Sequence, residues 1–159
     1  MEANAAAQGI QQLVTFRLGE EEYGVDILKV HEIDRMMDIT EVPNAPSCIE
    51  GVINLRGKVI PVINLRKKFN LPPREADERT KIVVVDIGTS AGMIVDSVSE
   101  VLRISSDIIE PPPPMASGTG SEYIRGVGKL QDRLLILLDI EKLLGARDSE
   151  NMAKAVAAI

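Results

Sequence analysis

The chain is poor in the residues that most enzyme and cofactor sites use. It has one histidine, one cysteine and no tryptophan, and its only aromatic side chains are two phenylalanines and two tyrosines. A single cysteine excludes an intrachain disulfide, which suits a reducing compartment. The net charge is −6, whereas proteins that neutralise phosphates are usually basic, and so few aromatics offer little base stacking. We therefore expect no nucleic-acid partner.

The few reactive side chains form no catalytic or metal-binding pattern. His31 has polar neighbours in the sequence, and we expect it to be a surface or structural residue. Cys48 has no histidine or arginine cluster beside it, which predicts a buried, inert thiol. No group of side chains has the spacing of a zinc site. The sequence predicts no catalytic residue, no metal, no cofactor and no enzyme activity.

Long apolar runs are also missing, and the charged runs are short. No segment approaches the roughly 20 apolar residues of a membrane span, and the first twelve residues do not resemble a signal peptide. We expect a cytoplasmic protein without direct membrane insertion. Glu20-Glu21-Glu22 at a predicted turn favours a solvated charge cluster. Arg66-Lys67-Lys68 favours the solvated face of a short helix rather than an anion site.

Alternation of apolar and polar residues predicts β-hairpins. The hairpins are expected at residues 13–28, at 51–65, at 82–87 with 92–95, and at 126–140. Arg56-Gly57 forms the tip of the second hairpin. Pro61 in its returning strand favours an edge or a bulge, so we expect that strand at a seam of a barrel.

These hairpins belong to an internal repeat. A shift of 68 positions aligns Val30 with Val98, Glu32 with Glu100 and Arg35 with Arg103. After an insertion centred on residues 115–121, a shift of 75 aligns Gly51 with Gly126, Val59-Ile60 with Leu134-Leu135, and Lys67 with Lys142. Each copy therefore has a hairpin, an extended segment, a proline turn, a second hairpin and a short helix.

The repeat predicts an all-β fold with short helices, built as two SH3-like five-stranded barrels. We expect a flexible tail at residues 1–11, one module at residues 12–145 and a tail or weak helix at residues 146–159. The two copies are expected at about residues 12–70 and 81–145. The linear repeat leaves open which strands close each barrel, and we favour an exchange of the early hairpins.

Apolar surface offers the remaining functional hypothesis. Val30, Val98 and Val101 follow the early hairpins at or near equivalent positions. Any one of them suits a barrel core, but together they could line a groove between the barrels. Glu32 and Arg56 are expected to pair, because Arg56 at its hairpin tip is free to reach out, and such a pair would orient a partner rather than stabilise the fold.

Several segments resemble the family of the chemotaxis coupling protein CheW, from about Gln12 to Gly145. The segments are GEEEYGVDILKVHEI at 19–33, GVINLRGKVIPVINLRKKF at 51–69, GMIVDSVSEVL at 92–102 and SEYIRGVGKLQDRLLILLDIEKLL at 121–144. The resemblance implies a non-enzymatic chemotaxis adaptor between the cytoplasmic tip of chemoreceptors and the regulatory domain of the histidine kinase CheA. It also implies a cytoplasmic location, at receptor arrays on the inner face of the membrane.

The resemblance also implies a receptor-binding face. The positions that match receptor-contacting residues of similar proteins are Val30, Glu32, Arg56, Val98 and Val101. One departure is Asp96-Ser97, where the family often has Asp-Gly. The resemblance assigns no individual residue to the kinase interface.

Without the resemblance, an SH3-like module for proline-rich peptides would be the next hypothesis. Such modules use a groove lined by aromatic side chains, and this chain has no tryptophan and few other aromatics. An enzyme is a weaker alternative because the chain has one histidine and no ligand cluster, and a nucleic-acid-binding barrel is weaker because the net charge is negative.

Overall fold

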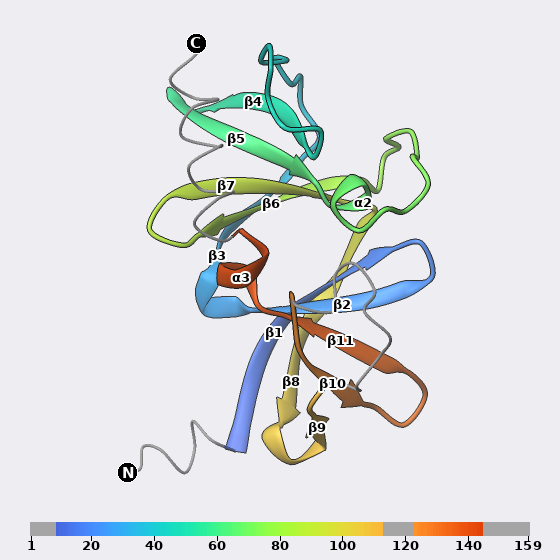
Figure 1. Ribbon diagram of the computed structural model, residues 1–159. Coiled ribbons are helices and arrows are strands. Elements are labelled where there is room, and N and C mark those ends of the chain that lie inside the picture. Colours follow the sequence, from blue (N-terminus) through green and yellow to red (C-terminus); the bar gives the residue numbers. More distant parts are fainter. Residues whose placement is uncertain (1–8, 113–122, 145–159) are drawn as a thin grey trace.

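The computed structural model describes residues 9–112 and 123–144, which are mostly β-strand (Figure 1). The strands are β1 (Ile10–Leu18), β2 (Glu21–Asp26), β3 (Val30–Arg35), β4 (Ile49–Leu55), β5 (Lys58–Asn64), β6 (Lys81–Asp86), β7 (Ser90–Val95), β8 (Ser97–Ser105), β9 (Ile109–Glu110), β10 (Ile124–Lys129) and β11 (Leu134–Leu138). The short helices are α2 (Leu65–Lys68) and α3 (Ile140–Leu143), with 3-10 turns η1 (Ile27–Lys29) and η2 (Ser106–Ile108). The four predicted hairpins are confirmed as β1–β2, β4–β5, β6–β7 and β10–β11. The predicted insertion at 115–121 and the tail at 146–159 lie outside the described residues.

The strands form two sheets, and each sheet contains strands from both copies of the repeat. The first sheet, which we call barrel one, has the order β8-β1-β2-β11-β10-β9. The second, barrel two, has the order β3-β6-β7-β5-β4. In Figure 1, barrel two occupies the upper part of the view and barrel one the lower part. Barrel two has the five strands expected, whereas barrel one gains the two-residue β9, which pairs with β10.

The favoured exchange of early hairpins is confirmed. The hairpin β1–β2 from the first copy lies between β8 and β11 of the second copy. In the same way, β6–β7 from the second copy lies between β3 and β5 of the first. Two parallel pairings join the exchanged hairpins to their hosts, β11 with β2 and β5 with β7. Neither barrel can form from one copy alone.

The three larger apolar clusters follow from this arrangement. A shared core contains residues from both sheets, and it includes Phe16, Val25, Ile63, Val83, Met93, Ile140 and Leu143. A second cluster belongs to barrel two alone and includes Ile53, Ile60, Val62, Ile82 and Val84. A third belongs to barrel one and includes Leu13, Ile104, Leu135 and Leu137. Strand β6 therefore buries Ile82 and Val84 inside barrel two and Val83 and Val85 in the shared core, which explains its continuous apolar run.

The short helices are capped in the same way in both copies. Asn64 accepts a hydrogen bond from the backbone N–H of Lys67, and Asp139 accepts one from that of Lys142. These two caps are equivalent positions of the repeat, and both residue types are favoured at a helix N-terminus. After α2 the chain turns at Asn70, whose positive φ of 59° is one that asparagine adopts readily at the end of a helix.

One prediction about barrel two is wrong. Pro61 does not mark an edge strand, because β5 lies between β4 and β7 in the sheet. It is opposite Val52 of β4, and the parallel pairing with β7 starts at the next residue, Val62. Proline is tolerated here because the hydrogen-bonded pairing of β5 with β7 begins only after Pro61. Strand β5 does lie where the β4–β5 and β6–β7 hairpins meet.

Candidate functional site

The predicted pair between Glu32 and Arg56 is present. The β4–β5 turn places Arg56 and Gly57 at positive φ, 53° and 86°, and the side chain of Asn54 accepts the Gly57 N–H at 2.8 Å. This turn points Arg56 outward, and its guanidinium donates to Glu32 Oε1 on β3. The Arg56 side chain is 68% exposed and that of Glu32 is 19% exposed. The ion pair therefore links the hairpin tip to the edge strand at the surface of barrel two.

A second carboxylate, Asp34, lies beside this pair and was not predicted. Its Oδ2 is buried and has no hydrogen-bond partner among the described residues. Burial, followed by hydrogen bonding with Glu32, raises the pKa of Asp34. Hydrogen bonding with Asp34 and with Arg56 lowers the pKa of Glu32. The sequence signal was available, because residues 32 and 34 of a strand share a face.

The three predicted valines occupy two kinds of position. Val30 and Val98 are half-buried and pack against the shared core. Val101 is 54% exposed on β8, opposite Val14 of β1. The structure thus brings Glu32 and Arg56 into contact and places Val30 and Val98 on one core. Val101 is not among the residues that pack against that core.

The interpretation of Arg66 as part of a solvated face is wrong. Its guanidinium binds Asp96 through two hydrogen bonds, Nε to Oδ1 at 2.9 Å and Nη2 to Oδ2 at 2.5 Å. Arg74 Nη1 also donates to Asp96 Oδ2, at 3.1 Å, as does the N–H of Gly19, at 2.7 Å. The Arg66 and Asp96 side chains are 13% and 11% exposed. This Asp96 network joins α2, the end of β7, the 71–80 connector and the β1–β2 turn.

Three other members of the two charged runs also have partners, whereas Glu20 and Glu21 are exposed, as expected for a solvated cluster. Lys67 pairs with Glu50 at 2.6 Å, and Lys68 lies 5.2 Å from the ring centre of Tyr123. Glu22 is buried, contrary to the expected solvated cluster, and its carboxylate lies 2.6 Å from Arg133 Nε. A buried charge needs such a partner, so the pair of Glu22 with Arg133 serves the fold.

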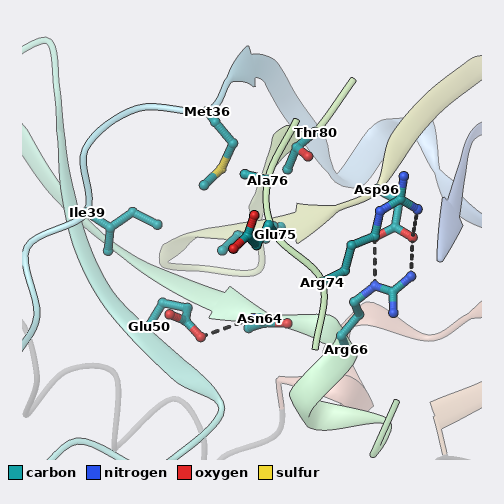
Figure 2. A pocket seen from close by; sticks show the side chains of 11 residues that line it. Met36, Ile39, Glu50, Asn64, Arg66, Arg74, Glu75, Ala76, Thr80 and Asp96 are labelled. Carbon is teal, nitrogen blue, oxygen red and sulfur yellow. Dashed lines mark hydrogen bonds and ion pairs between the residues drawn. The ribbon is translucent and has the colours of Figure 1, made fainter. Parts of the chain in front are cut away.

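The Asp96 network borders a pocket of about 200 Å³ in barrel two (Figure 2). Figure 2 shows Met36 and Ile39 on one side, and Arg66, Arg74 and Asp96 joined by dashed lines on the other. Glu50 accepts a hydrogen bond from Asn64 at 3.0 Å between them. Both signs of charge line the pocket, and Arg66, Arg74 and Asp96 are paired to one another, so its chemistry selects no particular ligand.

The residues most suited to catalysis are not brought together. The side chain of His31 is 61% exposed, as a surface residue should be, and its Nε2 lies 3.7 Å from Glu32 Oε1. Cys48 packs against the shared core but is only half-buried, so the predicted burial of its thiol is partial. Within residues 9–112 and 123–144, no three His, Cys, Asp or Glu side chains form a group that could hold a metal ion. In the same part of the chain, no helix has the length and apolar character needed to cross a membrane.

Comparison with known proteins identifies the family. The model of the CheW-like domain matches residues 12–148. The chain is 44% identical to the chemotaxis protein CheW of Klebsiella aerogenes, covering 91% of this chain and 90% of that protein. It is 42% identical to the CheW of Treponema pallidum, covering 89% and 86%. The crystal structure of the scaffolding protein TtCheW from Thermoanaerobacter tengcongensis superposes with a TM-score of 0.79 at 40% identity, covering 87% of this chain and 94% of that one. The chain therefore belongs to the CheW-like family, as a protein of chemotaxis coupling and scaffolding.

Proposed function

We propose that this chain is a non-enzymatic adaptor that bridges the cytoplasmic tip of chemoreceptors to the regulatory domain of the histidine kinase CheA. It would work in the cytoplasm, at receptor arrays on the inner face of the membrane, and give receptors control of the kinase. The module at residues 12–145 would act as one binding unit. Membership of the CheW-like family supports this proposal, since relatives are named as chemotaxis and scaffolding proteins.

The single observation that carries the receptor face is the surface ion pair of Glu32 and Arg56. Most of the Arg56 side chain remains exposed while its guanidinium is held by Glu32, so its orientation is fixed for a partner. The proposed receptor face comprises Val30, Glu32, Arg56, Val98 and Val101. Aliphatic side chains would supply apolar contact, and the ion pair would select the partner and its orientation.

Weak individual contacts suit such an adaptor. An affinity of about 1 μM corresponds to roughly −8 kcal/mol, and arrays strengthen such contacts through high effective concentration. Receptor control then requires that the signalling states of the receptor bind or orient the adaptor differently. A tighter, state-independent contact would hold the array together without transmitting a signal.

Co-sedimentation of the purified chain with a chemoreceptor cytoplasmic fragment and CheA tests the proposal. Arg56→Asp places a third carboxylate beside Glu32 and Asp34, so we expect at least tenfold weaker recovery of the receptor fragment. The matched control is Arg79→Asp, the same charge change on the exposed 71–80 connector. The thermal midpoint of Arg56→Asp should stay near that of the wild type, because this side chain is largely solvated.

The outcomes separate the role from the site. A ternary complex that survives Arg56→Asp would keep the bridging role and move the receptor face elsewhere. A well-folded wild-type chain that binds neither the receptor fragment nor CheA would overturn the proposal.

A further inference from the structure

The pocket beside Asp96 has an equivalent in the other copy of the repeat. A second pocket, of about 160 Å³, lies beside α3, and we call the two the α2 pocket and the α3 pocket. In Figure 1, α2 lies to the right of the junction between the barrels and α3 to the left. Three residues that line one pocket align with three that line the other at the repeat shift of 75, namely Glu50 with Arg125, Asn64 with Asp139 and Arg66 with Glu141.

The α2 pocket is covered by the chain that follows its helix. The N–H of Leu71 donates to the Arg66 carbonyl at 2.7 Å, and the Arg66 guanidinium donates to the Pro72 carbonyl at 2.7 Å. The 71–80 connector then passes along the pocket, as Figure 2 shows for Arg74 and its neighbours. Asp96 is only 9% exposed beneath this cover.

The α3 pocket has no equivalent cover among residues 9–112 and 123–144. Leu28 stands at the repeat position of Asp96, and it is 87% exposed. The residues on either side of it, Asp26 and Lys29, line the α3 pocket. A single exposed leucine is ordinary on a protein surface, but here the equivalent position is buried because a segment of chain crosses it. The contrast indicates that the α3 pocket also receives a segment.

The spare charge at the α3 pocket is positive. Asp26 and Asp139 each cap a helical turn, and Glu141 is paired with Lys29 at 2.6 Å. Arg125 is exposed, and its guanidinium donates to a neutral glutamine side chain at 2.7 Å. Within the part of the chain that the structure describes, it makes no ion pair. A complementary segment therefore carries carboxylates.

The sequence that follows α3 carries such carboxylates. At the repeat shift of 75, Arg74 of the connector aligns with Ser149, which Asp148 and Glu150 flank. The connector brings a cation to the α2 pocket, whose lining includes Glu50. The sequence after α3 reverses that charge, just as the lining of the α3 pocket does, so charge complementarity holds in both copies.

This segment also begins beside the pocket. Helix α3 itself lines the α3 pocket through Ile140 and Glu141. A segment attached so close has a high effective concentration, so weak contacts are enough to hold it. Beyond the carboxylates, Met152 and Val156 are four positions apart, a spacing that suits one apolar face laid over Leu28.

We propose that the α3 pocket is the docking site of residues 145–159 of the same chain, which lie outside the described residues. Asp148 and Glu150 lie beside Arg125, and the apolar residues that follow cover Leu28. The docked segment covers the second junction of the barrels as the connector covers the first. This inference concerns the folded chain alone and does not depend on the proposed function.

Paramagnetic NMR of the full chain tests this contact. A nitroxide is attached at Ala155→Cys in a Cys48→Ser background, which leaves one labelling site. We expect the methyl signals of Leu28 to lose more than half of their intensity. The methyl signals of Ile94, at the equivalent α2 pocket, should keep theirs. A far-UV circular dichroism spectrum checks that each variant is folded.

A charge swap tests how the segment is recognised. Arg125→Glu should restore the Leu28 signals of the labelled chain, whereas Arg79→Glu, the same change on the exposed connector, should not. Adding Asp148→Lys and Glu150→Lys to Arg125→Glu should bring the loss of intensity back. A purely structural effect of Arg125 would not be reversed in this way.

Three results would overturn the proposal. Undiminished Leu28 signals in a folded, labelled chain would show that the segment does not dock there. An equal loss when isotope-labelled chains are mixed with separate nitroxide-labelled chains would place the contact between two copies instead. A loss of intensity that persists in Arg125→Glu would refute recognition through charge.

Discussion

Replacing Asp96 by asparagine removes one negative charge from the junction of the barrels while nearly preserving the shape of the side chain. The carboxylate of Asp96 accepts hydrogen bonds from Arg66, Arg74 and the backbone N–H of Gly19. An asparagine must turn its NH₂ group toward at least one of these donors. The variant therefore leaves the Arg66 guanidinium with little solvent and without its carboxylate partner, whereas Arg74 is more exposed and keeps its ion pair with Asp77.

The cost follows from the burial of the pair. Removing one partner of a buried ion pair costs about 3–5 kcal/mol. Because the side chains of Arg66 and Asp96 remain 13% and 11% exposed, solvent screens part of this, and we expect a loss of about 2–4 kcal/mol in the free energy of unfolding. Burial pushes the pKa of Asp96 up, but hydrogen bonds from Arg66 and Gly19 outweigh it and lower the pKa overall. The stabilisation is therefore complete above the ordinary aspartate pKa and lost as the pH falls through the lowered value of the folded state.

Urea unfolding followed by far-UV circular dichroism measures this loss, since the chain has no tryptophan to report it. A double-mutant cycle with Arg66→Met should give a coupling energy of about 1–3 kcal/mol between the two side chains. The control is Lys29→Met, which breaks the exposed contact between Lys29 and Glu141 near the equivalent junction and should leave the midpoint unchanged. Additive effects, or a loss below about 1 kcal/mol at pH 7, would refute the assignment of Asp96 as a structural tie.

Three further predictions test the fold and the edge strand. Gly51→Ala should destabilise the chain by several kcal/mol, about 2–4, because its φ is +152° and an added Cβ would collide with the Thr40 carbonyl; a midpoint within error of the wild type would contradict this. Asp34→Asn should raise the urea midpoint at pH 7 and not at about pH 3, because burial and Glu32 raise the pKa of Asp34 and ionising it costs stability. Leu135→Ala, in the interior of barrel one, should cost about 2–5 kcal/mol and still give a single transition, since two separate transitions would show that the barrels unfold independently.

The hairpins could be predicted from the sequence because their information is local. The alternation of apolar and polar residues, the turn residues and the strand lengths of one hairpin can all be read within about fifteen residues. Each late hairpin is followed by its own short helix, and the two helices are capped in the same way. The exchange was favoured but could not be decided, since parallel pairings such as Val62 with Gly92 join residues distant in the chain. The misplacement of Pro61 has the same origin, because the position of β5 within its sheet depends on that distant pairing.

The site shows a similar division. The pair of Glu32 and Arg56 was predicted because Glu32 aligns with Glu100 in the repeat and because Arg56 lies at an exposed hairpin tip. Arg66 was misread because a cation on a short helix next to two lysines is usually solvated, and its partner Asp96 lies 30 positions away. One signal was available: Asp96 directly follows a buried strand, where an ionised carboxylate needs a cation nearby.

The hairpin exchange also constrains how the proposed adaptor could transmit a signal. Separating the barrels would break the parallel pairings of β2 with β11 and of β5 with β7, expose the shared core and open the Asp96 network. Such a rearrangement exposes a large apolar area, whereas a receptor state shift supplies only a few kcal/mol. On the proposed function, the two barrels therefore move as one body. A change in the receptor would then reach the kinase as a change in where and how tightly this body is held, and a variant that loosens the Asp96 network should weaken coupling even though the proposed receptor face is unchanged.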